Sequence, residues 1–148
     1  NAIKRRQAYQ LSMEAHGFVP HIFQVKGSGW NFEEIGQSEG GALIHDGAFP
    51  TNTVLCSNDR LAIGLLSAAY KLGRKVGHGA DCDIRIAGHD DHPFSRFTCP
   101  SLTTIAQDYA AIADRAASSL FRIIDTEKTL SERDETLFEG KLVLRDSA

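Results

Sequence analysis

The side chains best suited to bind a small molecule stand just after segments that read as β-strands. They are an indole, a carboxamide and a carboxylate, supplied by Trp30, Asn58 and Asp90. In open α/β sheets, ligands bind beyond the carboxyl ends of the strands. A carboxylate or a carboxamide can pair with two adjacent hydroxyls, and an indole face packs against a sugar or a base. These residues predict a site for a small polar ligand, to which Arg5 adds a forked, charged donor.

Each of these residues also has a purely structural interpretation. Asn58, or Asp59 beside it, is suited to cap a following helix. Asp90 is suited to a turn, and a single tryptophan is often a packing residue. Arg5 lies in a Lys-Arg-Arg run, which is typical of a solvated helix face. The expected convergence of these side chains on one edge of the sheet favours ligand binding over the structural interpretations.

Other chemistry finds little support in the chain. Residues 89–92 read His-Asp-Asp-His, but neighbours in an extended segment point to opposite faces and cannot all reach one metal ion. The Gly-x-Gly runs at 27–29 and 77–79 lack the third glycine of a dinucleotide-binding fingerprint. Ser57 and the three cysteines lack the setting of a nucleophile elbow. We therefore expect a protein that is not an enzyme and needs no cofactor or metal.

Composition bounds the class of protein. The 148 residues carry 16 Lys+Arg and 19 Asp+Glu, and 42% are hydrophobic, which is typical of one folded domain or lobe. No apolar run approaches the ~20 residues of a membrane span. The net charge of -3 argues against direct nucleic-acid binding by this segment. Three cysteines without CxxC spacing favour reduced thiols in a cytoplasm. The absence of an initial Met suggests a piece of a longer protein.

Hydrophobic periodicity predicts alternating helices and strands. Helices are expected at 2–16, 32–46, 59–73 and 108–125, and strands at 21–25, 53–57, 84–88, 102–105 and 136–144. The second helix should be weak, because each of its glycines costs about 1 kcal/mol relative to alanine. The strand at 53–57 has a buried composition. The alternation predicts an α/β fold with a mostly parallel sheet and helices on both faces.

Five motifs stand in order along the chain, at residues 5–9, 54–64, 84–91, 100–107 and 142–147. One is a strand followed by Asn-Asp and x-x-Ala-x-Gly, another is a strand ending in Gly-His-Asp-Asp, and a third is Pro-x-Leu-Thr-Thr-Ile-x-Gln. Together they resemble the motifs of the lactose/galactose-repressor family of bacterial transcription regulators. The chain departs from that family at His89, where the family has Tyr or Phe in a Gly-aromatic-Asp-Asp motif, and at Ala8, where the family has Gly.

The resemblance implies a periplasmic-binding-protein-like (type I) fold with two lobes and a ligand between them. Residues 1–106 would belong to the C-terminal lobe of the effector-binding domain. Residues 107–136 would hold a hinge crossing and a helix of the N-terminal lobe, and 137–148 would return as a strand to the C-terminal lobe. The DNA-binding helix-turn-helix would lie outside this chain.

The resemblance also implies roles for particular residues. The effector pocket would be lined by Arg5, Trp30, Asn58, Asp90, Gln107 and Tyr109. A homodimer would form through the 60–72 helix and the 92–99 loop, with Phe94, Phe97 and Leu65 exposed.

The family implies a cytoplasmic regulator that senses a sugar or nucleoside-like effector and changes its affinity for operator DNA through dimer geometry, without a membrane. A periplasmic sugar-binding protein of a transporter is the alternative, because it shares the fold and the ligand chemistry. The Leu-Thr-Thr-Ile run and the closing Leu-Val-Leu-Arg-Asp-Ser favour the regulator.

Overall fold

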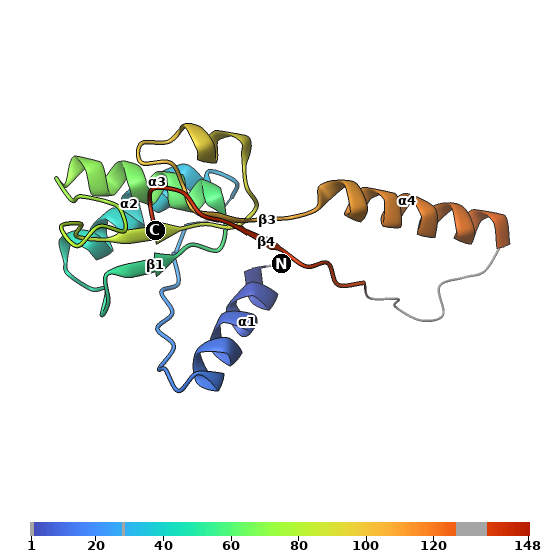
Figure 1. Cartoon of the computed structure of the whole chain (residues 1–148), viewed down its shortest axis with the longest axis horizontal. Helices are drawn as coiled ribbons and strands as arrows, with labels where there is room; N and C mark the ends of the chain where they lie inside the picture. The colour runs from blue at the N-terminus through green and yellow to red at the C-terminus, as the bar shows by residue number, and fades with distance from the viewer. Residues whose placement is uncertain (1, 28, 127–135) are drawn as a thin grey trace.

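The computed structural model describes residues 2–27, 29–126 and 136–148 (Figure 1). Four helices, a short 3-10 helix and four short strands follow one another along this part of the chain. In order they are α1 (Ala2–Ala15), α2 (Phe32–His45), β1 (Thr53–Leu55), α3 (Asp59–Lys71), β2 (Arg85–Ala87), η1 (Pro93–Phe97), β3 (Thr104–Ala106), α4 (Tyr109–Thr126) and β4 (Lys141–Val143).

The strands form a small sheet region in which β1 and β2 are parallel, as predicted, and β3 and β4 are antiparallel. β1 pairs with β2 in parallel, with Val54 opposite Ile86. A parallel bridge between Ala87 and Thr103 leads on to β3. β4 then pairs with β3 in the antiparallel direction. The predicted α/β class with a mostly parallel sheet is confirmed.

The hydrophobic core lies where α3 packs on β2 and the start of the β3 segment. The helix buries Ala62, Leu65, Leu66 and Ala69 along one stripe. The strands contribute buried aliphatic side chains, namely Ile84, Ile86 and Leu102. Burial of one large aliphatic side chain stabilises the fold by about 1.5–3 kcal/mol, so this stripe holds α3 against the strands.

Two glycines allow α2 to lie very close to α3. A Cβ atom at Gly36 would overlap the carbonyl oxygen of Leu61, and one at Gly64 would overlap the carbonyl oxygen of Glu33. The predicted helix at 32–46 is confirmed, but its glycines do more than weaken it. They let two helix backbones touch, so the packing against α3 compensates for their low helix propensity.

One predicted strand is absent, and another is more exposed than predicted. Residues 21–25 form no strand, although Phe23 packs its ring edge-on against Phe49 at 5.2 Å. A strand exists only through ladder bonds to a neighbour, and β2 is the one strand that pairs with β1 in the described part of the chain. β1 is therefore an edge strand, and Leu55 is exposed instead of buried.

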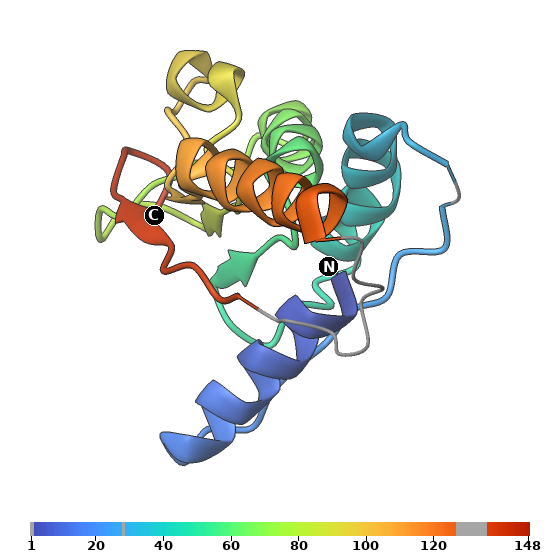
Figure 2. The same ribbon diagram turned by 90° about the vertical axis from the view of Figure 1, so that its right-hand side faces the viewer.

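Two helices stand apart from the core. Figures 1 and 2 show α1 on the opposite side of β1 from α2 and α3, while α4 extends away from the body in Figure 1. No residue of α1 is buried, and none of α4 is buried as far as residue 125. Both helices agree with the predicted ranges. The apolar face predicted for α4 is present but uncovered, and Leu120 and Ile124 are exposed.

The end of the chain follows the prediction only in part. The strand predicted at 136–144 is shortened to β4, and most of the segment between the predicted helix at 108–125 and this strand lies outside the described residues. Among the helices described, none has the length and apolar character required to cross a membrane.

Candidate functional site

Asp90 lies beyond the carboxyl end of β2, in an unusual backbone conformation. Its φ angle is 119°, a region that residues with a Cβ rarely adopt. A hydrogen bond to β3 stabilises this backbone conformation, because the Asp90 N–H donates to the carbonyl oxygen of Ile105 at 2.9 Å. The edge of the sheet therefore fixes the position of this carboxylate.

Three side chains donate to the carboxylate of Asp90 or to its backbone carbonyl. Arg5 Nη2 in α1 donates to Oδ1 at 2.6 Å, and Gln107 Nε2 donates to the same oxygen at 2.5 Å. The hydroxyl of Tyr109, at the start of α4, donates to the backbone carbonyl of Asp90 at 2.7 Å. His89 Nδ1 also lies 3.2 Å from Oδ1. The structure thus brings together four of the six residues predicted for the pocket.

The donors leave the second oxygen of Asp90 more open than the first. Oδ2 has one long contact, 3.4 Å from Arg5 Nη1. The same guanidinium nitrogen donates to the carbonyl oxygen of Ser57 at 2.5 Å. Burial raises the pKa of the Tyr109 hydroxyl, and the nearby charge of Asp90 adds to the increase. Tyr109 therefore stays protonated and remains a donor at neutral pH.

A small hollow of about 180 Å³ lies at this edge of the sheet. Three predicted residues, Trp30, Asn58 and Asp90, line it together. Trp30 is 80% exposed, and its ring meets Phe32 edge-on at 6.0 Å. The remaining lining residues are Phe32, Asp59, Arg60 and His92.

Asn58 has the structural role that its sequence position indicates. Its side-chain Oδ1 accepts a hydrogen bond from the backbone N–H of Leu61 at 2.8 Å, which caps α3. Asn58 also lines the hollow, so the residue that caps α3 is at the same time part of the candidate site.

Asp59 follows the predicted 53–57 strand at the expected ligand edge, and in the structure its side chain has a role that its interpretation as a helix cap did not include. Its side chain is buried, at 1% exposure. One oxygen accepts from Ser95 Oγ at 2.6 Å and from the backbone N–H of His92 at 2.7 Å, while the other accepts from Thr104 Oγ1 at 2.5 Å. This carboxylate joins α3 to η1 and β3 and so fixes one wall of the hollow.

Arg60 and Glu33 form an ion pair beside the hollow. Arg60 Nε and Nη2 donate to the two carboxylate oxygens of Glu33 at 2.5 and 2.7 Å, and the guanidinium lies 5.3 Å from the ring centre of Phe32. The hydrogen bond from Arg60 lowers the pKa of Glu33. The pair joins α2 to α3, so helical spacing within either element gives no signal of it.

The closing segment of the chain is tied to the strands by polar contacts. Arg145 pairs with Asp91 at 2.6 Å and donates to the carbonyl oxygen of Leu102 at 2.8 Å. Ser147 is fully buried, and its Oγ donates to the carbonyl oxygen of Ile86 at 2.6 Å. Arg145 and Ser147 therefore hold the segment that carries Asp91 and the end of β2.

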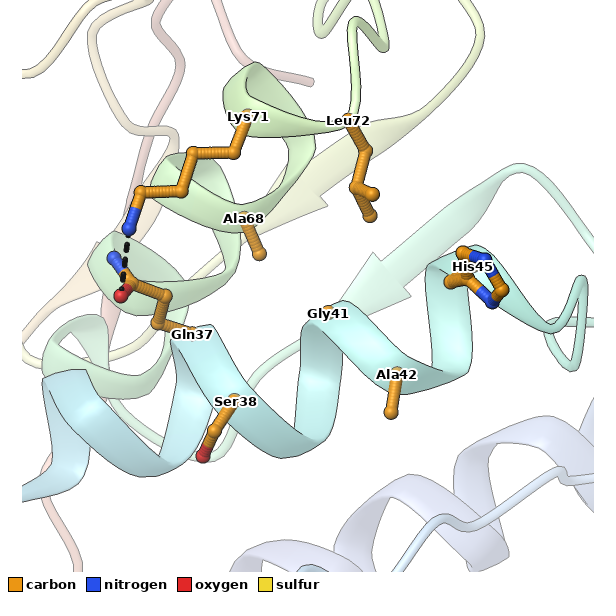
Figure 3. Close-up of a pocket in the computed structure, with 8 residues that line it drawn as sticks. All are labelled: Gln37, Ser38, Gly41, Ala42, His45, Ala68, Lys71 and Leu72. Carbon is orange, nitrogen blue, oxygen red and sulfur yellow. Dashed lines mark hydrogen bonds between the residues drawn. The ribbon is translucent and has the colours of Figure 1, made fainter.

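A larger hollow of about 420 Å³ lies between α2 and α3 (Figure 3). Its polar contact joins Lys71 Nζ to Gln37 Oε1 at 3.0 Å. Small residues, Gly41, Ala42 and Ala68, form much of its lining. No residue predicted for the ligand site lines it, so the hollow at the sheet edge remains the candidate site.

The exposure expected for a dimer surface holds for two of the three residues. Phe94 and Phe97 of η1 are 66% and 76% exposed. Leu65 is only 3% exposed, so its predicted exposure is wrong. The reason is the close approach of α2, where a Cβ at Gly40 would overlap the Leu65 side chain.

The described part of the chain contains no cluster of metal-binding side chains, and one of its thiols has a raised pKa. Across residues 2–27, 29–126 and 136–148, no group of three or more His, Cys, Asp or Glu side chains is placed to hold a metal ion. Burial raises the pKa of the Cys56 thiol to about 12, so this thiol stays protonated at neutral pH.

Comparisons with known proteins agree on one kind of relative. The family model described as periplasmic binding protein-like domain matches residues 1–148. An HTH-type transcriptional repressor PurR of Glaesserella parasuis is 35% identical over 127 residues, which are 80% of this chain and 36% of that protein. The chain spans about two-fifths of the length of the first curated relatives it matches.

Solved structures show the same likeness. A LacI-type transcription regulator from Bifidobacterium animalis is 27% identical, with a TM-score of 0.78 over 97% of this chain and 49% of that one. A LacI family transcriptional regulator from Lactobacillus casei, solved with bound sucrose, is 25% identical, with a TM-score of 0.67 over 96% of this chain and 50% of that one.

Proposed function

Because the chain belongs to the periplasmic binding protein-like domain family and, within it, to the lactose/galactose-repressor group, we propose that it is the effector-sensing part of a transcription regulator. The named relatives are transcriptional repressors and regulators, which favours this role over a periplasmic transport protein or an enzyme. The partners of the intact protein would be a small effector and operator DNA in the cytoplasm.

The observation that carries the proposal is the shared hollow of Trp30, Asn58 and Asp90. An exposed indole provides an apolar plate, and Asp90 Oδ2 provides an acceptor with little competition from the protein. This chemistry suits a ring that carries hydroxyl groups, such as a sugar or a nucleoside. Arg5, Gln107 and Tyr109 would complete the pocket mainly by holding Asp90 in place.

The division of the chain into lobes is part of the proposal. Residues 1–106 and 137–148 would form one lobe, and the segment 107–136 would cross to the other. The uncovered apolar face of α4 supports this division, because such a face is normally buried against another part of a protein. Closure of the lobes over an effector would bring α4 and the hollow together around it.

Signal transfer would use a homodimer. The exposed rings of Phe94 and Phe97 lie in η1, which is joined through Ser95 to Asp59 at the start of α3, and they suit a dimer surface. An effector that binds one arrangement of the lobes more tightly than another would shift the spacing of two DNA-binding units and so the affinity for operator DNA.

The test uses the intact gene product with its operator DNA. A thermal-shift screen of sugars and nucleosides should find a compound that stabilises the protein, quenches or shifts Trp30 fluorescence and changes operator affinity in a gel-shift assay. A compound that changes operator affinity but leaves Trp30 fluorescence unchanged would refute the role of the indole. Failure of every compound to change operator affinity would refute effector sensing of this class.

A further inference from the structure

Each arginine beside the hollow forms an ion pair with a carboxylate of the protein, and one further carboxylate accepts hydrogen bonds from uncharged donors. Arg5 pairs with Asp90 at 2.6 Å, and Arg60 pairs with Glu33 at 2.5 Å. Asp59 is an additional carboxylate whose contacts are O–H and N–H donors. Two guanidinium groups therefore face three carboxylates, so the balance around the hollow is negative.

His92 also lines the hollow, and its Nδ1 accepts a hydrogen bond from the backbone N–H of Phe94 at 3.3 Å. Among the described residues that line the hollow, Arg60 is the guanidinium, so its charge is the attractive group that an anionic ligand would meet there.

Glu33 controls the charge and the orientation of Arg60. It uses Nε and Nη2 of the guanidinium, and Phe32 lies at 5.3 Å from the guanidinium carbon. Nη1 takes no part in the contact with Glu33, so it can donate to a neutral oxygen of a ligand. The hydrogen bond from Arg60 lowers the pKa of Glu33, which keeps this carboxylate ionised at neutral pH.

We propose that Glu33 masks the positive charge of Arg60 and thereby makes the hollow select uncharged, hydroxyl-bearing ligands over anionic ones. The inference rests on the proposed function of this site. A uronate or a sugar phosphate would bring a negative charge close to Asp59 and Asp90, which share the hollow. A neutral sugar avoids this repulsion and still offers hydroxyls to Asp90 Oδ2 and the Asn58 amide.

The test compares the intact protein with its Glu33→Gln variant. Paired probes, galactose with galacturonate and glucose with glucuronate, are titrated by calorimetry, and the ratio of the two Kd values is the readout. The wild type should prefer the neutral member of a pair. Glu33→Gln should shift that ratio toward the acid by about tenfold, because one compensating charge near a partly exposed site is removed.

Glu34→Gln is the matched control. Glu34 is the next residue in α2, and its carboxylate accepts from Asn31 Nδ2 at 2.7 Å instead of from Arg60. This variant has the same change in net charge and should keep the wild-type ratio. A double variant, Glu33→Gln with Arg60→Gln, should also return to the neutral preference, because the exposed cation is gone.

Every outcome decides the matter. A wild type that prefers the acids, or an unchanged ratio in a folded Glu33→Gln protein, overturns the proposal. If Glu33→Gln fails to fold, the ratio is read in Arg60→Gln, where a gain in acid binding overturns it and a retained neutral preference supports it. Absence of binding to all four probes also overturns it. A nucleoside that changes operator affinity in that case leaves the proposed function standing.

Discussion

Replacing Asp90 by asparagine should remove the ligand acceptor while keeping the scaffold around it. Asn tolerates a positive φ better than most residues, so the backbone at 119° is preserved. Its amide oxygen can take the place of Oδ1, where Arg5 and Gln107 donate. Its NH2 group then takes the place of Oδ2, and a ligand hydroxyl that donated to Oδ2 meets a donor instead.

The expected loss follows from one buried polar contact left unsatisfied. Such a contact is worth about 1–3 kcal/mol, so effector affinity should fall roughly 5- to 150-fold. Calorimetry on the intact protein with an effector from the screen measures the change, and far-UV circular dichroism checks the fold. Asp90→Ala should abolish the response to effector, because it also removes the partner of Arg5.

A matched control is Asp81→Asn. Asp81 pairs with Lys75 in the loop before β2, at the end of the strand opposite to the hollow, and both side chains are exposed. Its replacement should leave effector affinity unchanged. Unchanged affinity in Asp90→Asn, with a normal spectrum, would refute the claim that this carboxylate binds the effector.

Three further outcomes test the packing and the charges. Gly64→Ala should lower the free energy of unfolding by about 1–3 kcal/mol in urea titrations, because its Cβ would overlap a backbone carbonyl of α2; an unchanged midpoint would contradict the close helix contact. The pKa of Glu33 is lowered in the fold, so its contribution to stability is present above the unfolded pKa and is lost as pH falls through the folded value. The stability of the wild type relative to Glu33→Gln should therefore decline in acid, and a constant difference would refute this. Desolvation raises the pKa of the half-buried Cys56 thiol to about 12, so Cys56 should react with a thiol reagent at pH 8 far more slowly than exposed Cys99, and equal rates would contradict this shift.

Local patterns in the sequence were enough to predict the helices and the cap. The stripe of α3 and the capping oxygen of Asn58 depend on residues within one or two turns of each other, and both are found as predicted. The strand at 21–25 is the opposite case. Its composition suits a strand, but a strand also needs a partner, and none of the described strands pairs with it.

The candidate site was only partly accessible to the same reasoning. The rule that strand ends converge applies to Asn58 and Asp90, which follow β1 and β2 and line one hollow. Trp30 lines the same hollow although the strand expected before it does not form, so the rule does not account for its place. The pairing of Arg60 with Glu33 and the burial of Asp59 depend on contacts between distant elements. Such contacts leave no periodic trace in a single sequence.

Asp90 also links two peripheral helices to the body of the molecule. α1 and α4 bury no residue in the described chain as far as position 125, yet Arg5 and Tyr109 each reach the same short segment. A ligand bound to Asp90 would therefore act on the anchoring contacts of α1 and α4 together. Because each helix is long compared with its contact at Asp90, a small displacement of this residue would move the far ends of both helices by a larger distance.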